Sequence, residues 1–254
     1  MTSLILADST PQTAGRFGRS LRAELRNVRT TRGTRWALGL TAALWVVVGA
    51  GVAAIALLVD AESVSISGAL LGMGAAVTVF VPILAIFIMA ADWQSRDVLT
   101  TFALEPRRHI VFLAKALTAL IVCTVLVAVA AVLAVVFTAG LALAAGATIV
   151  WNADAESIAV LLWSAAVGTV SGIAYGAATQ RVAIAIVFSL VQGFVIDPLL
   201  MLIPHGIGSW FRLTAITEAG SGTGELGPAL TAGLLWLVVP LAIGFARNQR
   251  ADVQ

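Results

Sequence analysis

Residues 36–59 read WALGLTAALWVVVGAGVAAIALLV and contain no charged side chain. A helix that crosses the hydrocarbon core of a bilayer needs about 20 mostly apolar residues, and this stretch is long enough. The composition agrees, because 60% of the residues are hydrophobic and 11% are charged, whereas soluble domains are about 25% charged. Lipid, rather than water, is therefore the expected solvent for most of the surface.

Further apolar stretches follow, so the sequence predicts an all-α integral membrane protein with six transmembrane helices in one domain, residues 1–254. The expected spans are 36–59, 67–91, 111–139, 157–178, 182–203 and 228–246. Between residues 110 and 150 the one charged residue is Lys115, and this run is too long for one perpendicular helix. We expect the third span either to tilt or to end near Gly140, with GLALAAGATIV as an outer segment.

The distribution of basic residues predicts the orientation, because Lys and Arg favour the cytoplasmic ends of spans. Fourteen of the fifteen basic residues precede the first span, follow the last, or border the second-to-third and fourth-to-fifth loops, and Arg212 is the exception. Both termini are therefore expected in the cytoplasm. The preference for Arg over Lys suggests a GC-rich bacterium, so the expected location is a bacterial plasma membrane. A net charge of +2 gives no support to a nucleic-acid partner.

The N-terminal segment, about residues 17–33, has the pattern of an amphipathic interfacial helix. At 100° per residue, four basic residues share about one quadrant, namely Arg19, Arg22, Arg26 and Arg29. A different face carries Leu21, Leu25 and Val28. One interpretation is a helix in the headgroup plane, with its apolar side toward lipid and its arginines toward phosphates or solvent. The alternative is a basic cluster that only sets the topology. Membrane lipid is an expected partner in the first case.

A charged island, ADWQSRDVLTTFALEPRRHIVFLAK, occupies residues 91–115 between the second and third spans. Its DVLTTFAL part could form a short helix, with Asp97 as N-cap or first-turn acid and Pro106 at its end. Apolar residues of this helix cluster on one side: Val98, Leu99 and Phe102. Such a helix suits docking into a groove on a soluble partner. The alternative is a solvated turn.

With this island the chain resembles the permease subunits of ATP-binding-cassette exporters of the ABC-2 type. The likeness is carried by LRAELRNVRTTRGTRWALGLTAAL (21–44), DVLTTFALEPRRHIVFLAKAL (97–117) and FARNQRADV (245–253). The approach to the second stretch, DWQSRDV, departs from the family pattern because it lacks a Gly. Together with the six spans, the likeness covers nearly the whole chain.

The resemblance implies that the second-to-third loop is a coupling helix against an ATPase. The residues implicated are Asp97, Val98, Leu99, Thr101, Phe102 and Leu104. It also implies partners, namely two copies of an ATP-binding-cassette ATPase subunit and a second permease subunit, the same or different. Short outer helices between the fifth and sixth spans are a further implication.

The chain itself has no nucleotide-binding motor, because a P-loop needs G-x-x-x-x-G-K-[ST] and the lone lysine stands in FLAKAL. We therefore expect no enzyme activity, no catalytic residue and no cofactor in this chain, with ATP and Mg²⁺ bound by the partner ATPase. The single cysteine, Cys123, lies in an apolar run, so neither a disulfide nor a metal site is expected.

Two features lie inside the spans. Gly168, Gly172 and Gly176 form a stripe at four-residue spacing, which lets helix backbones approach closely, either within one subunit or between subunits. In the fifth span, VQGFVIDPLLMLIP (191–204) carries Asp197, whose ionised form would cost roughly 2.5–3.5 kcal/mol against lipid.

Two structures are open for this part of the fifth span. Pro198 could kink a continuous helix, so that Asp197 faces a polar cavity. Alternatively the helix could break, with Asp197 as the N-cap of a new short helix. The candidates for a substrate path are Gln192, Asp197, Phe194 and Phe80. A purely structural role for the polar pair is the alternative.

The function predicted from these observations is the transmembrane permease subunit of an ATP-driven exporter, coupled to separate ATPase subunits. One alternative is an ion- or proton-coupled secondary carrier, for which Asp197 is the single candidate relay. The others are a membrane enzyme or a membrane scaffold without transport activity.

Overall fold

The structure is a computed structural model that describes residues 13–60, 62–95, 108–152 and 154–250. Within these ranges, six helices are long and apolar enough to cross a membrane, at Arg32–Val59, Ile66–Trp93, Arg108–Ala145, Ala155–Thr179, Val182–Met201 and Leu226–Gln249. They coincide with the six expected spans to within a few residues. The chain therefore has the character of a multi-pass membrane protein.

The first four spans are single helices: α2 (Arg32–Val59), α3 (Ile66–Ser95), α5 (Arg108–Ala145) and α6 (Ala155–Thr179). The last two each contain a π-helical turn. The fifth consists of α7 (Val182–Val191), η1 (Gln192–Ile196) and α8 (Asp197–Met201), and the sixth of α10 (Leu226–Gly233), η3 (Leu234–Val238) and α11 (Val239–Arg250). Between them lie a 3-10 segment, η2 (Pro204–Phe211), and a short helix, α9 (Thr214–Gly220). An additional helix, α1 (Thr13–Thr30), precedes α2.

The third span is one helix of 38 residues, α5. At 1.5 Å per residue it is about 57 Å long, so it must tilt in, or extend beyond, a hydrocarbon core of about 30 Å. The expectation that it could end near Gly140 is wrong, because the helix continues to Ala145. It stops where Gly146 adopts a φ of 73° and Ala147 N–H donates to Ala142 O at 2.9 Å, a Schellman-type end.

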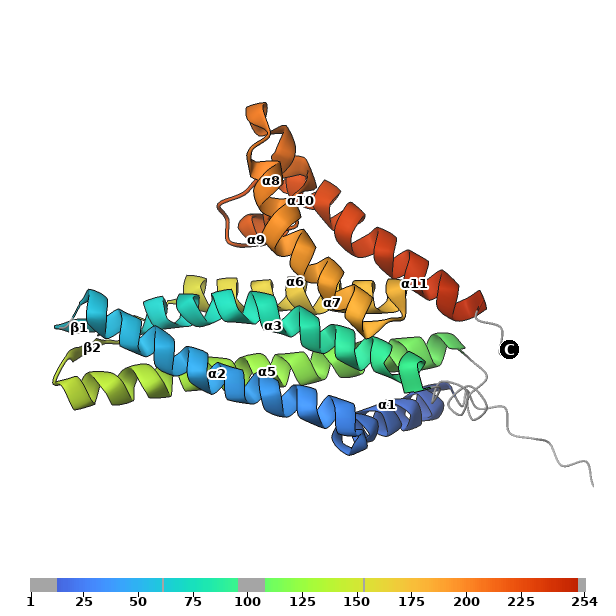
Figure 1. Cartoon of the computed structure of the whole chain (residues 1–254), viewed down its shortest axis with the longest axis horizontal. Helices are drawn as coiled ribbons and strands as arrows, with labels where there is room; N and C mark the ends of the chain where they lie inside the picture. The colour runs from blue at the N-terminus through green and yellow to red at the C-terminus, as the bar shows by residue number, and fades with distance from the viewer. Residues whose placement is uncertain (1–12, 61, 96–107, 153, 251–254) are drawn as a thin grey trace, which may run out of the picture.

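A short parallel strand pair corrects the all-α expectation. β1 (Ser63–Ser65) pairs with β2 (Thr148–Val150), at the end of the helices opposite α1 (Figure 1). Asp60 turns the chain toward β1, because its Oδ1 accepts the N–H groups of Glu62 at 3.0 Å and Ser63 at 3.1 Å. Strands of three residues are too short to show an alternation of apolar and polar side chains, so the sequence could not predict them.

The core lies at the crossing of α3 and α6, the most buried of the spans. A Cβ atom at Gly172 would lie 2.4 Å from the carbonyl oxygen of Pro82, and one at Gly176 would lie 3.0 Å from Met89 Cβ. At Gly168 it would lie 3.3 Å from the Pro82 ring. The glycine stripe is thus filled by α3 of the same chain, which corresponds to the first of the two packing alternatives.

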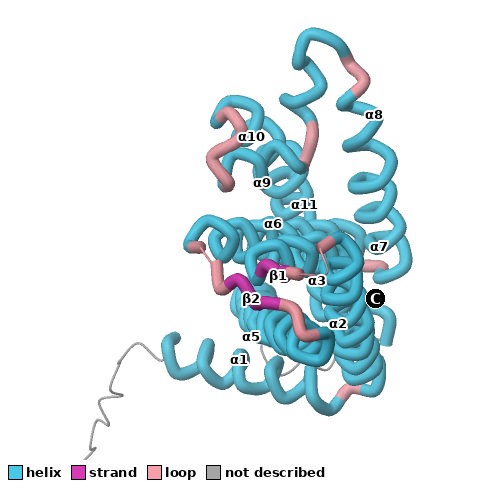
Figure 2. Tube along the Cα trace, turned by 90° about the vertical axis from the view of Figure 1, so that its left-hand side faces the viewer, coloured by secondary structure: helices cyan, strands magenta, loops and turns pink. Residues whose placement is uncertain are grey.

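The remaining helices are arranged around this crossing. α2, α3, α5 and α6 run side by side, whereas the C-terminal segments from α7 to α11, orange and red in Figure 1, lean away from them. α1 runs crosswise to the spans at one end of the bundle, as Figure 2 shows most clearly.

Candidate functional site

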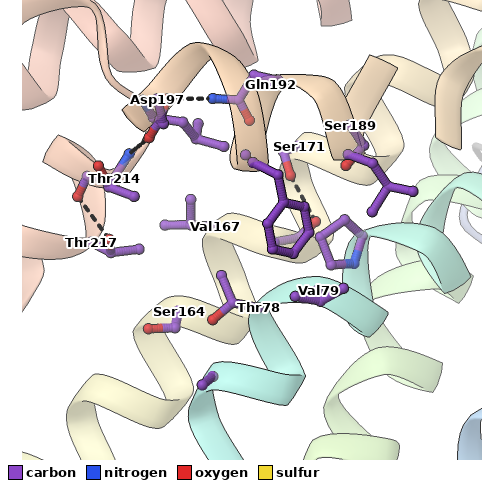
Figure 3. A pocket seen from close by; sticks show the side chains of 17 residues that line it. Thr78, Val79, Ser164, Val167, Ser171, Ser189, Gln192, Asp197, Thr214 and Thr217 are labelled. Atoms are coloured by element: carbon purple, nitrogen blue, oxygen red, sulfur yellow. Dashed lines mark hydrogen bonds between the residues drawn. The ribbon is translucent and has the colours of Figure 1, made fainter. Parts of the chain in front are cut away.

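A cavity of about 320 Å³ lies between α3, α6, the π turn η1 and the short helix α9 (Figure 3). Hydroxyl groups dominate its polar lining, from Thr78, Ser164, Ser171, Ser189, Thr214 and Thr217. The amide of Gln192 and the carboxylate of Asp197 complete the polar part, and Phe194, Val167 and Pro82 are among its apolar walls. The cavity is therefore mainly apolar with hydrogen-bonding groups at its edges, as is common for small-molecule sites.

Asp197 is buried, with 3% of its surface exposed, and its carboxylate accepts three hydrogen bonds. Oδ1 accepts from Gln192 Nε2 at 2.7 Å and from Leu213 N–H at 3.0 Å. Oδ2 accepts from Thr214 N–H at 2.9 Å. Since Leu213 and Thr214 begin α9, this carboxylate caps that helix and ties it to the fifth span.

The backbone of the fifth span explains how Gln192 and Asp197 meet. Asp197 has helical dihedral angles, φ −58° and ψ −49°, and its N–H bonds to Gln192 O five positions back, in a π turn. The interpretation of a break, with Asp197 as a non-helical N-cap, is wrong. The helix is instead continuous and distorted, next to Pro198, which has no N–H to donate. π turns of this kind are frequent at functional sites.

Some hydroxyl groups of the cavity lining already have hydrogen-bond partners, and others have none. Thr78 Oγ1 donates to Gly74 O, and Ser171 Oγ donates to Gly168 O. The hydroxyls of Ser164 and Ser189 make no hydrogen bond to the described residues. The amide oxygen of Gln192 is turned away from Asp197 (Figure 3). The cavity can therefore offer these groups to a ligand.

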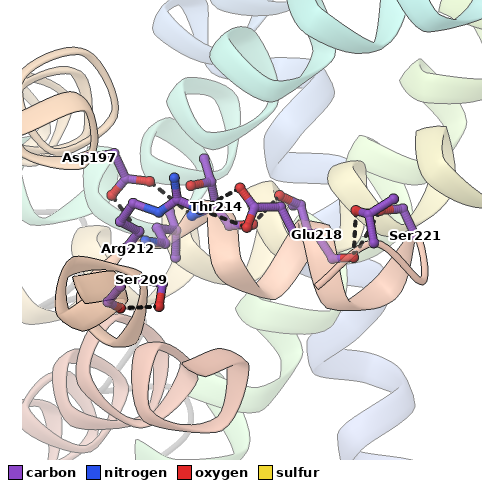
Figure 4. A network of polar contacts seen from close by, with 10 residues as sticks. Asp197, Ser209, Arg212, Thr214, Glu218 and Ser221 are labelled. Atoms are coloured by element: carbon purple, nitrogen blue, oxygen red, sulfur yellow. Dashed lines mark hydrogen bonds and ion pairs between the residues drawn. The ribbon is translucent and has the colours of Figure 1, made fainter. Parts of the chain in front are cut away.

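Arg212, in the loop between the fifth and sixth spans, is the basic residue closest to Asp197 in the sequence. It pairs with Glu218 and not with Asp197. Its guanidinium bonds to both carboxylate oxygens of Glu218, at 2.5 and 2.6 Å (Figure 4). No Lys or Arg is among the residues that line the cavity. A ligand there meets hydroxyls, an amide and a capped carboxylate, and no cation.

The structure brings together three of the four substrate-path candidates. Gln192, Asp197 and Phe194 line the cavity. Phe80 does not, because it packs, partly buried, against the main core cluster. The prediction for Phe80 therefore has no support from its position.

A buried ionic cluster at the other end of the bundle was missed by the sequence reasoning. Lys115 of α5, 6% exposed, forms ion pairs with Glu24 of α1, at 3.0 Å, and with Asp92 of α3. Asn27 Nδ2 also donates to Asp92 Oδ2 at 3.4 Å. A carboxylate on the packed side of α1 and a lysine inside an apolar span were the signals, because each needs a buried partner.

The four arginines of the expected interfacial helix lie on α1 as the periodicity predicts. Arg19, Arg22, Arg26 and Arg29 are exposed, whereas Val28 is buried in the core cluster that contains Phe112. Leu21 and Leu25 are partly exposed, whereas Val28 packs on the protein itself. The reason is that the end of α5 supplies an apolar surface next to the ion partner of Glu24.

The expected coupling residues lie outside the described residues: Asp97, Val98, Leu99, Thr101, Phe102 and Leu104. The helices on either side are described, with α3 ending at Ser95 and α5 beginning at Arg108. In the described part of the chain, no group of three or more His, Cys, Asp or Glu residues could hold a metal ion.

Comparison with known proteins does not assign the chain to a group. No family model matches it, and no curated protein matches it.

Proposed function

We propose that the chain is the transmembrane permease subunit of an ATP-driven exporter of the ABC-2 type, and that its substrate passes through the hydroxyl-lined cavity. The observation that carries the proposal is this cavity, with its unpartnered hydroxyls of Ser164 and Ser189 among helices long enough to span a membrane. Polar groups at such a depth are unfavourable unless they line a path or bind one another.

The proposed orientation places α1, the 96–107 segment and the C-terminus in the cytoplasm of a bacterium. Segment 96–107 would contact a separate ATPase subunit, which binds ATP and Mg²⁺. A second permease, the same or different, and a second copy of the ATPase would complete the transporter. Support comes from the excess of basic residues on this side. The ion pair between Asp92 and Lys115 gives further support, because it joins the two helices that flank the segment.

The hydrogen bonds of Asp197 favour this proposal over an ion- or proton-coupled carrier. A relay carboxylate must exchange its proton or ion during transport, whereas this one accepts three hydrogen bonds from the protein. A role in holding α9 in place accounts for them without a relay.

The ATPase partnership is tested by purification of the tagged chain from native membranes and identification of the co-purifying chains. An ATP-binding-cassette subunit is expected, and its ATP hydrolysis should fall when Asp97 is reversed to Arg or when Phe102→Ala is introduced. Phe211→Ala is the matched control, because this half-exposed side chain lies on η2 at the other end of the molecule. Normal hydrolysis in the Asp97 and Phe102 variants would exclude this coupling segment.

The cavity is tested by filling it. Ser164→Trp should block export while the ATPase still co-purifies, because the new side chain occupies the cavity. Leu162→Trp is the control, since Leu162 is 53% exposed on the outer surface of α6. Compounds retained by cells that lack the chain are measured after each variant is restored. Ion movement by the purified chain alone, in liposomes without ATP, would favour a carrier instead.

A further inference from the structure

The arginine row of α1 has no function in the site described above. Arg19, Arg22, Arg26 and Arg29 are all exposed. Among the described residues, the ion pairs are those of Lys115 and Arg212, so no carboxylate neutralises this row. Four neighbouring guanidinium groups that repel one another are unfavourable without a counter-charge. Within the part of the chain that the structure describes, the row is therefore a site of unbalanced positive charge that can accept an anion.

The buried cluster fixes the direction in which the row points. Glu24 stands two positions from Arg22 and two from Arg26, so at 100° per residue it lies on nearly the opposite side of the helix. Its carboxylate is held inward by Lys115 at 3.0 Å. Two further residues keep this side of α1 against the protein. Asn27 donates a hydrogen bond to Asp92, and Val28 is buried. α1 cannot roll about its axis, and the arginines are presented outward.

Arg22 and Arg26 border a hollow of about 390 Å³, with Ala23 between them and Asn27 and Thr30 at its edge. The polar edge groups are already used, because Thr30 Oγ1 donates to Arg26 O at 3.1 Å and Asn27 bonds to Asp92 and Thr31. The charged donors of the hollow are thus the two guanidinium groups. Each presents a planar fork of N–H donors that matches two oxygens of a phosphate.

The position of α1 indicates where that phosphate comes from. The helix lies crosswise to the spans (Figure 2). Trp36, in the first turns of α2, is 79% exposed, and tryptophans at span ends lie at the level of the lipid headgroups. A crosswise helix beside such a residue runs along the headgroup layer. Its outward arginines then meet lipid phosphates.

We propose that Arg22 and Arg26, flanked by Arg19 and Arg29, form a binding site for the phosphate of an anionic phospholipid headgroup. The site is prepared before the lipid arrives, because the Glu24–Lys115 pair sets its orientation. It is independent of the export function and of any nucleotide.

The test uses the purified full chain in nanodiscs of phosphatidylcholine with increasing phosphatidylglycerol, at constant ionic strength. The thermal unfolding midpoint should rise with phosphatidylglycerol and saturate. In R22Q/R26Q the fraction needed for half of the rise should increase several-fold, because the two guanidinium forks that would bind the phosphate are lost. The control R32Q/R35Q removes the same charge from two exposed positions nearby, and it should change the fraction much less.

R22K/R26K distinguishes a specific phosphate site from diffuse electrostatic attraction to the membrane, because lysine retains the charge and lacks the planar fork of N–H donors. Weaker binding in this variant supports the site. Normal binding in R22K/R26K, with equal losses in R22Q/R26Q and R32Q/R35Q, would mean diffuse attraction and would overturn it. Equal stabilisation by inorganic phosphate in pure phosphatidylcholine would overturn the lipid as its source. Unchanged midpoints in phosphatidylcholine alone show that the exposed substitutions leave the fold intact.

Discussion

Lys115 Nζ lies 3.0 Å from Glu24 Oε2, so a lysine within the third span binds a carboxylate on the helix that precedes the first span. Asp92, near the end of α3, binds the same ammonium group. The cluster thereby joins three helices that are far apart in the sequence. Its members flank the 96–107 segment on both sides, so a displacement of either flank is shared with α1.

Lys115→Met should destabilise the chain strongly, because it leaves the carboxylates of Glu24 and Asp92 buried without their counter-charge. Removal of one partner from a buried ion pair costs about 3–5 kcal/mol. The thermal unfolding midpoint in detergent measures the loss, and trypsin cleavage within α1 should become faster. Arg35→Met, which removes the same charge from an exposed position, is the control. Equal midpoints for the two variants would contradict the role of the cluster.

Gly172→Ala should also destabilise the chain, for a steric reason. The new Cβ would lie 2.4 Å from Pro82 O and 2.7 Å from Ala85 Cβ, so α3 and α6 must move apart. Overpacking of this kind costs about 1–3 kcal/mol. Gly140→Ala in α5 has nothing within 4 Å and should be neutral or stabilising by up to about 1 kcal/mol. Denaturant unfolding of both variants compares the two sites, and similar stabilities would mean that the crossing is looser than described.

Asp197→Asn should loosen α9 while the spans remain folded. An amide keeps one acceptor oxygen and places an NH₂ group against Leu213 N–H or Thr214 N–H. The loss of such a bond costs about 1–3 kcal/mol. Amide hydrogen exchange at these two residues should become faster. If export stopped while exchange and stability stayed normal, Asp197 would act on the substrate rather than on the loop.

The strand pair should open in acid, because the Ser63 hydroxyl, followed by the N–H groups of Glu62 and Ser63, lowers the pKa of Asp60 from 3.8. Since the folded pKa is depressed, the stabilisation is complete above the ordinary value and disappears as the pH falls through the lowered pKa. The protection of the β1 and β2 amides from hydrogen exchange, relative to an unfolded peptide at the same pH, should therefore fall below about pH 4. Asp60→Asn should remove this pH dependence, and Glu62→Gln should retain it.

The sequence predicted the spans well because each is decided locally, by length and by the absence of charge. The contact between Gln192 and Asp197 does not follow from the sequence, because positions five apart lie about 140° from one another on a regular α-helix and the π turn brings them together. The capping of α9 could not be predicted either, because the N–H groups that Asp197 accepts lie sixteen and seventeen positions further on. The Glu24–Lys115 pair joins positions 91 apart, and no local periodicity reports such a contact.

The π turn at Gln192–Ile196 sets the phase of everything that follows it in the fifth span. A π turn holds one residue more than an α turn, and one residue corresponds to 100° of rotation. With a regular α turn, Asp197 would point about a quarter of a revolution away from Leu213 and Thr214. The segment that follows the fifth span would then lose the two hydrogen bonds that hold the start of α9 to Asp197. One extra residue in this helical turn thus directs the Asp197 carboxylate toward the first residues of α9.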